Sequence, residues 1–234
     1  MPKAKLDVRV YPIDEPKGDT KAFASVSIND MVAIRGVRVV EDKKGLFVTM
    51  PQSLNNKTGK YHDIAFPLSG DLRKEISKTV LDEHSRVSAL PPEQRGYDNP
   101  EPATTDTINT DNIKLDIRVY PHENPQSNTK AFASISVDNL IAIRGIRVVE
   151  GDEGPFVAMP QSQDRYMKYH DVAFPLTADL RKEMSAGVLA KLSAEKSIER
   201  KPTLGDKLAE GNQKAVEHAT AQKPAAKTRA GALE

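Results

Sequence analysis

The sequence contains no cysteine and no tryptophan, and only 5% of its 234 residues are aromatic. The lack of cysteine excludes disulfide bonds, thiolate catalysis and zinc sites built on cysteine. With so few aromatics, we expect thin cores made of Val, Ile, Ala and Phe. The start MPKAKLDVRV lacks the apolar stretch of a signal peptide, and no run of about 18 apolar residues could span a bilayer. We therefore expect a soluble cytoplasmic protein without membrane insertion.

The overall charge is almost balanced, because 34 basic side chains face 33 acidic ones. Net charge alone therefore favours neither nucleic acid, nor a membrane surface, nor an acidic partner. Any prediction of this kind must come from local clusters of charge.

A repeated YHD motif places His62 beside Asp63 and His170 beside Asp171. Adjacent residues of a strand point to opposite faces, so they are poorly placed to act as a catalytic pair. Neither a serine elbow nor a third metal ligand accompanies them. We expect no catalytic residue, no metal site and no cofactor, and hence a protein that is not an enzyme.

Most of the chain is one unit written twice. KLDVRVYP at residues 5–12 returns as KLDIRVYP at residues 114–121, and the match continues with one residue lost. The exchanges are mostly Val/Ile or Met/Leu, which keep the core volume. The further matching segments are TKAFASVSIND and TKAFASISVDN, AIRGVRVVE and AIRGIRVVE, FVTMPQS and FVAMPQS, and KYHDIAFPL and KYHDVAFPL.

The composition divides the chain into four parts. The single gap between the copies falls in a polar stretch, 54–59 against 163–167, which indicates a surface loop. A segment rich in Pro, Asp, Asn and Thr separates the copies and predicts an extended linker. The last residues mix Ala, Lys, Glu and Gln with few large apolar side chains, which predicts a flexible tail. The expected parts are unit 1 at 4–90, a linker at 91–112, unit 2 at 113–193 and the tail at 194–234.

Within each copy, the apolar pattern predicts an α+β fold. LDVRV and AFASVSI alternate as half-buried strands do, and the pair Asn29-Asp30 predicts a tight hairpin into the next strand. GLFVTMP and HDIAFPL supply further short strands. After Ser69, residues Leu72, Ile76 and Val80 recur every four, so one amphipathic helix closes the unit. We expect a small antiparallel sheet of four or five strands with this helix on one face.

Two arginines lie on the apolar strand AIRGVRVV of each copy. Arg35 and Arg38 are three residues apart, so on a regular strand they point to opposite faces. One of each pair could extend a nucleic-acid surface, and a structural role at the sheet edge is an equal alternative. Gly36 predicts a bulge or a close backbone approach. The second copy has Arg144, Arg147 and Gly145 at these positions.

The combined strings AFASVSINDMVAIRGVRVVE, GLFVTMP and YHDIAFPLSGDLRKEISKTVLDEH resemble the SpoVG family, named for stage V sporulation and septation regulation. The resemblance covers residues 5–89 and 114–192. The family usually has a histidine between DIA and the proline, where this chain has Phe66 and Phe174.

The resemblance implies fold, partners and site residues. Family members resemble small homodimers joined through their sheets, so the two copies are expected to pair as an intramolecular pseudo-dimer, with further self-association possible. They bind DNA and RNA as bacterial regulators of sporulation, septation and cell division. Basic residues of the closing helix are implicated, which here are Arg73 and Lys74, joined by the neighbouring Lys78, with Arg181 and Lys182 in the second copy.

Two classes of function remain open. One is a DNA-binding or RNA-binding regulator whose helix and strand cations contact phosphates, which gives affinity without sequence information. The alternative is a protein-interaction module in which the duplicated sheets and the Lys/Ala-rich tail bind partners without nucleic acid. The helix cations would then serve only to keep the surface solvated.

Overall fold

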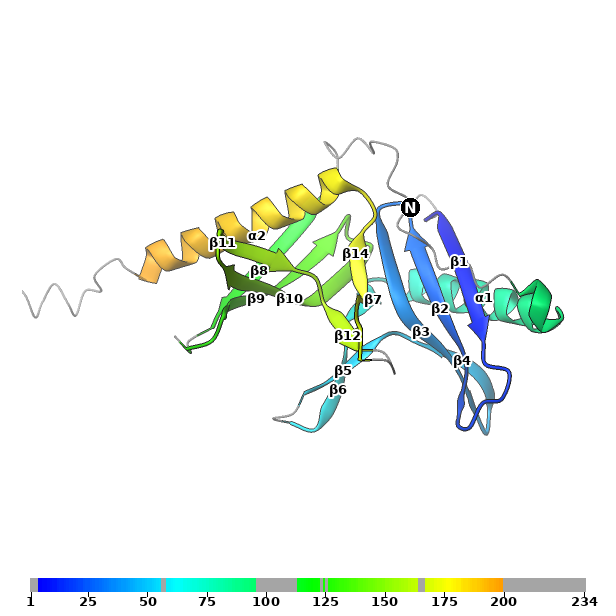
Figure 1. Ribbon diagram of the computed structural model, residues 1–234. Helices are drawn as coiled ribbons and strands as arrows, with labels where there is room; N and C mark the ends of the chain where they lie inside the picture. The colour runs from blue at the N-terminus through cyan, green and yellow to red at the C-terminus, as the bar shows by residue number, and fades with distance from the viewer. Residues whose placement is uncertain are drawn as a thin grey trace, which may run out of the picture. The chain divides into compact units, whose positions relative to one another are not determined.

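The computed structural model describes residues 4–55, 58–95, 113–122, 124, 126–163 and 167–199. Both copies belong to one compact unit that extends to Ser193. The described elements are antiparallel strands and two long helices in two repeated units, each closed by its own helix, as the sequence predicted (Figure 1). Among these residues, no helix has the length and apolarity needed to cross a membrane.

The first copy forms a twisted antiparallel sheet in the order β1-β2-β3, with β4 also paired to β3. Its alternating pattern buries Val10, Ala24, Val26 and Val37 on one face. The second copy repeats this arrangement in the order β8-β9-β10-β11. The strands are β1 Leu6–Pro12, β2 Thr20–Ile28, β3 Val32–Asp42, β4 Gly45–Thr49, β8 Leu115–Pro121, β9 Thr129–Val137, β10 Ile141–Gly151 and β11 Gly154–Ala158.

The hairpin predicted at Asn29-Asp30 is confirmed. Both residues have positive φ, 51° and 53°, and the backbone N–H of Met31 donates to Ile28 at 2.9 Å. Asn and Asp tolerate this left-handed conformation better than other side chains, so the local sequence encodes the turn.

Of the two alternatives predicted at Gly36, a bulge or a close backbone approach, the structure shows the bulge. Ala24 lies opposite Val37, but Val26 lies opposite Ile34, so two residues of β3 oppose the single Ser25 of β2. Gly36 itself has φ +75°, a value that glycine adopts without strain.

Each sheet is completed by a short strand from the other copy. Strand β14, Ala173–Pro175 of the second copy, pairs with β3, and β7, Ala65–Pro67 of the first copy, pairs with β10. Backbone bonds extend both exchanges, from Arg35 N to Val172 O at 2.7 Å and from Leu68 N to Leu140 O at 2.8 Å. The expected pairing of the two copies within one chain is therefore observed.

Two further hairpins extend from the sheets. In each copy, the hairpin lies between the last strand of the main sheet and the short strand that is exchanged with the other copy. They are β5 Gln52–Asn55 with β6 Lys60–Asp63, and β12 Gln161–Gln163 with β13 Tyr169–Asp171.

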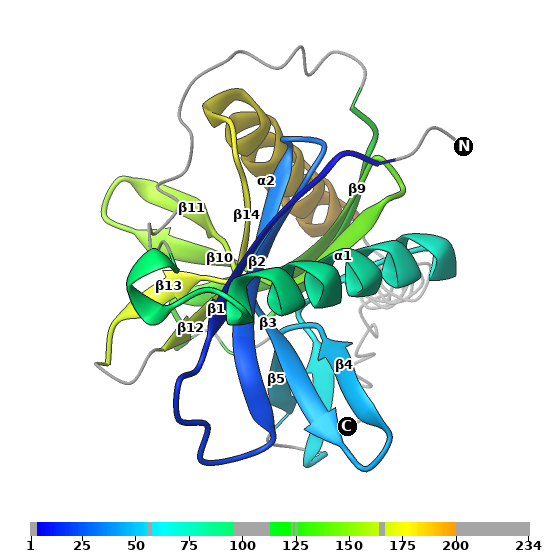
Figure 2. The same cartoon turned by 90° about the vertical axis from the view of Figure 1, so that its right-hand side faces the viewer.

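Helix α1, Gly70–Ser88, lies across one face of the first sheet (Figure 2). It begins as predicted, because the Ser69 hydroxyl accepts the backbone N–H of Leu72 at 3.1 Å. Leu72, Ile76 and Val80 are buried beneath it. Helix α2, Ala178–Glu199, has the matching cap, in which Leu180 N donates to Thr177 at 3.2 Å.

The start of the predicted linker is folded onto the first copy. Residues Pro92–Gln94 form one turn of 3-10 helix, and the Arg95 guanidinium donates to Asp14 and, at 2.9 Å, to the Leu90 carbonyl. The rest of the predicted linker and almost all of the predicted tail lie outside the described residues.

Candidate nucleic-acid interface

The cations of helix α1 lie on its exposed face, but most have acidic partners. Arg73 donates to Asp63 of the adjacent hairpin at 3.2 Å, and Lys78 pairs with Asp82 one turn further along the helix. Lys74 is exposed. The helix carries four basic and four acidic side chains, so its face is close to neutral. Exposed ion pairs of this kind contribute at most about 1 kcal/mol of stability, so phosphates can displace the carboxylates at low cost.

The second helix repeats the arrangement. Arg181 lies 3.5 Å from Asp171, and Lys182 lies 4.0 Å from Asp179. In both copies the carboxylate that holds the helix arginine also accepts a hydrogen bond from a glutamine, Gln52 to Asp63 and Gln161 to Asp171. The arginine therefore ties the helix to the neighbouring hairpin as well as presenting charge.

The prediction that Arg35 and Arg38 point to opposite faces is wrong, because the bulge adds one residue between them. Ile34 and Val37 are both buried under the helix, so the strand loses its alternation between these two positions. Arg35 and Arg38 consequently lie on the same face, the one directed away from α1. Arg144 and Arg147 follow the same pattern about Gly145.

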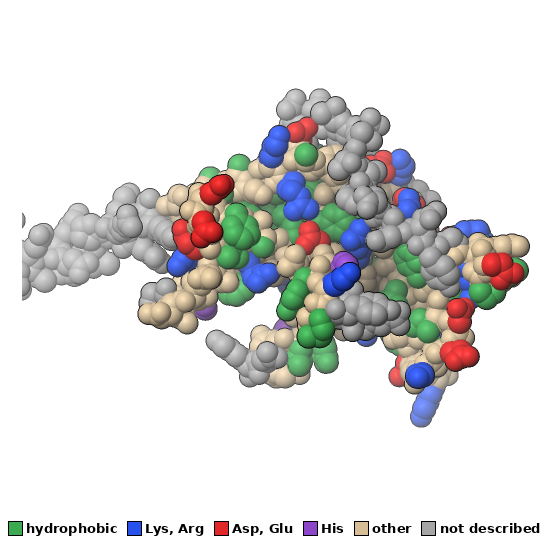
Figure 3. All heavy atoms as spheres, viewed as in Figure 1, with side chains coloured by type: hydrophobic (Ala, Val, Ile, Leu, Met, Phe, Trp, Pro, Cys, Tyr) green, Lys and Arg blue, Asp and Glu red, His purple; other side chains and the backbone are tan. Residues whose placement is uncertain are grey.

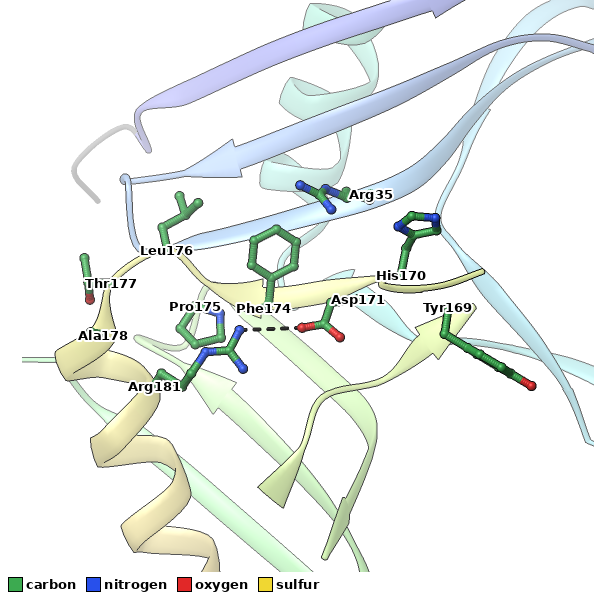
Figure 4. A pocket seen from close by; sticks show the side chains of 10 residues that line it. All are labelled: Arg35, Tyr169, His170, Asp171, Phe174, Pro175, Leu176, Thr177, Ala178 and Arg181. Carbon is green, nitrogen blue, oxygen red and sulfur yellow. Dashed lines mark ion pairs between the residues drawn. The ribbon is translucent and has the colours of Figure 1, made fainter. Parts of the chain in front are cut away.

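A strand arginine of one copy and a helix arginine of the other line the same pocket. A pocket of about 420 Å³ is lined by Arg35 from β3 and by Phe174, Asp171 and Arg181 from the second copy. The Arg35 guanidinium stacks over the Phe174 ring, 4.8 Å from its centroid, while Asp171 holds Arg181 (Figure 4). His170 lies at the same pocket, whereas the Tyr169 ring points away from it.

The same contacts recur with the roles of the two copies reversed. Arg144 stacks over Phe66 at 4.6 Å, and Asp63, close to Phe66 in the chain, holds Arg73. The two sets of predicted cations, on strands and on helices, are thus combined across the copies. In the view of Figure 3, Lys and Arg side chains lie among hydrophobic, acidic and His side chains around the region of β14.

Sequence reasoning missed the roles of Phe66, Phe174, Asp63 and Asp171. Each is identical in both copies, but its partner lies in the other copy or on another element, so local spacing gave no sign of the contact. The signal available was the substitution of phenylalanine at a position where the resembled family has histidine.

A family model described as SpoVG matches residues 4–86 and 113–194, which covers both copies. The chain belongs to the SpoVG family. Its curated relatives include proteins named as septation protein SpoVG from Myxococcus xanthus and Anaeromyxobacter sp. strain K. These are 38% and 36% identical over 80 residues, which is 34% of this chain and 78% and 76% of the relatives.

A similarly named relative from Clostridium perfringens strain 13 is 36% identical over 84 residues, 36% of this chain and 91% of that protein. One SpoVG unit therefore accounts for most of each of these relatives. This chain holds two such units and joins them through exchanged strands.

Proposed function

We propose that this SpoVG protein is a cytoplasmic, non-enzymatic regulator that binds DNA or RNA in septation or sporulation. The observation that carries the proposal is the pocket lined by Arg35 of one copy and Arg181 of the other. The contacts that hold these arginines recur for Arg144 on Phe66 and for Arg73 on Asp63. Both members of each pair were predicted from the sequence on separate grounds.

The geometry suits phosphate binding. Stacking on Phe174 holds the planar Arg35 guanidinium in place, so less side-chain entropy is lost when it binds an anion. Arg181 lines the same pocket from helix α2. The side chain of Lys182, the next residue of this helix, is 80% exposed. These cations occur once in each pairing of the copies, so the protein offers two sets of positive charge to the phosphates of a nucleic acid.

Binding is tested by fluorescence anisotropy with labelled single-stranded and duplex oligonucleotides of mixed sequence, from 50 to 200 mM salt. The proposal expects affinity that falls steeply with salt, by a log–log slope of about 0.7 to 0.9 for each phosphate contact. The variant Lys74→Ala/Lys182→Ala should lower this slope, because neither lysine bridges the helix to a hairpin.

The matched control is Lys43→Ala/Lys44→Ala, which removes two exposed lysines at the turn between β3 and β4. It changes the net charge by the same amount, and we expect it to leave the slope close to that of the wild type. Absence of binding to every oligonucleotide at 50 mM salt refutes the proposal.

A second candidate function, a protein-interaction module, is favoured by one observation. The hairpin β5–β6 pairs Leu54 with Tyr61, which are 45% and 65% exposed. An exposed apolar pair on a projecting hairpin is typical of a docking surface. Nucleic-acid binding that survives Leu54→Ala and Tyr61→Ala, together with loss of a protein partner, would separate the two functions.

A further inference from the structure

The face of the first sheet that is directed away from α1, here called the outer face, carries an ordered row of aromatic and cationic side chains. Along β1 and β2 the buried residues point to the helix, so their neighbours point to the outer face. Tyr11 lies opposite Phe23, and Phe23 lies opposite Arg38. With strands about 4.8 Å apart, these three side chains span roughly 10 Å across the sheet.

A second row lies beside the first. Arg9 is opposite Ser25, and the bulge places Arg35 opposite the same serine. Two arginines therefore flank the aromatic pair on one side, and Arg38 ends the aromatic row. Asp7 is the acidic residue on this part of β1, and it lies 3.9 Å from Arg9. In the second copy the matching Arg118 donates to Asp116 at 3.4 Å, so one arginine of each outer face has an acidic partner and the other two exceed it. The outer face is therefore more basic than the near-neutral face of helix α1.

The phenylalanine rings of the outer faces are accessible, whereas Tyr11 is half-buried. Phe23 is 45% exposed, and its counterpart in the second copy, Phe132, is 42% exposed. The Tyr11 hydroxyl hydrogen-bonds to Ser25, and partial burial raises the pKa of Tyr11, so the ring is held on the sheet and stays neutral. A phenylalanine ring exposed in the middle of a strand leaves apolar area in water that folding could have covered.

The two copies differ on their helices but agree on their outer faces. Lys78, Asp82 and Glu83 are replaced by Ala186, Ala190 and Lys191. The outer-face residues are unchanged, although none of them belongs to the buried core. The identical pairs are Arg9 and Arg118, Tyr11 and Tyr120, Phe23 and Phe132, Arg35 and Arg144, and Arg38 and Arg147.

We propose that the outer faces bind single-stranded nucleic acid, with unpaired bases stacked on Phe23 and Tyr11 and on Phe132 and Tyr120, and with the arginines on the phosphates. Stacking of this kind needs bases whose faces are free, which a duplex does not offer. The inference rests on the proposed function and narrows its ligand to an unpaired strand.

The test measures anisotropy with labelled 12-nucleotide oligo(U) and oligo(dT) and with a 12-base-pair duplex. We expect the wild type to prefer the single strands. Phe23→Ala/Phe132→Ala should weaken single-strand binding five-fold or more, since one stacked base is worth about that much or more by alanine substitution. Its salt slope should stay unchanged, because no phosphate contact is removed.

Two variants complete the design. Arg38→Ala/Arg147→Ala should lower the salt slope by about 0.7 per contact on a single strand. Leu54→Ala removes an apolar side chain with the same 45% exposure as Phe23 but outside the outer face, so it should bind as the wild type does. Circular dichroism and thermal unfolding check that each variant is folded.

The outcomes separate the two proposals. If the wild type binds but the phenylalanine variant binds equally well, or if the duplex binds as tightly as the single strands, the stacking inference is overturned while the proposed function stands. If no oligonucleotide binds at low salt, both fail.

Discussion

The guanidinium of Arg35 lies 4.8 Å from the centroid of the Phe174 ring, so a cation of the first SpoVG copy is stacked on an aromatic side chain of the second. The contact sits on the exchanged strand β14, which pairs with β3 over only three residues. Because so few backbone bonds join the copies at this point, side-chain contacts contribute a large share of the local stability.

Replacing Phe174 by leucine should therefore destabilise the protein. Leucine keeps most of the buried volume but lacks the ring face, so the loss is about 1 to 2 kcal/mol of unfolding free energy. Chemical denaturation measures it. Phe156→Leu is the control, because Phe156 is 51% exposed, and it should unfold with the wild type. An unchanged midpoint for Phe174→Leu would show that the stack contributes nothing.

The bulge at Gly36 gives the second prediction. Gly36→Ala forces a side chain into φ +75°, and this costs about 1 to 2 kcal/mol. Steric overlap is not the cause, because the nearest atom to an added Cβ, on Pro51, is 3.8 Å away. Gly70→Ala provides the control, since it adds the same methyl group in open space at the start of α1. If the two variants unfold alike, backbone strain at the bulge is refuted.

Local features of the fold could be predicted from the sequence, whereas contacts between the two copies could not. The turn at Asn29-Asp30, the cap at Ser69 and the bulge at Gly36 were predicted because local residues determine them. The exchange of β7 and β14 was not, since each strand is three residues long and its partner lies in the other copy. The faces of Arg35 and Arg38 were assigned wrongly because a strand of regular alternation was assumed through the bulge.

His84 gives a prediction of pH dependence. Burial lowers the pKa of His84, and its Nδ1 finds no hydrogen-bond partner among the described residues. In the folded protein the His84 imidazole therefore takes up a proton only at a lower pH, whereas in the unfolded chain it does so near pH 6.5. The unfolding free energy should be unaffected above that pH and should fall as pH is lowered through 6.5 towards the folded pKa.

The variant His84→Leu isolates this effect, because the second copy has the buried Leu192 at the matching position. Its advantage over the wild type should grow between pH 7 and pH 5 in urea unfolding experiments. The neighbouring Glu83, whose pKa is lowered by its hydrogen bond from Arg86, is present in both proteins and cancels in the difference. A difference that stays constant with pH would exclude titration of His84 as the cause.

The strand exchange predicts how the chain behaves when it is cut. With an engineered protease site between residues 96 and 112, cleavage separates the copies covalently but leaves β7 on β10 and β14 on β3. The fragments should elute together in size-exclusion chromatography with light scattering, at the 25.7 kDa mass of one chain. Leu68→Pro/Leu176→Pro removes the N–H groups that donate to Leu140 and Met31 at 2.8 Å, so the same cut should release separate fragments. If the unmodified fragments already separate at micromolar concentration, the linker rather than the exchanged strands holds the copies together.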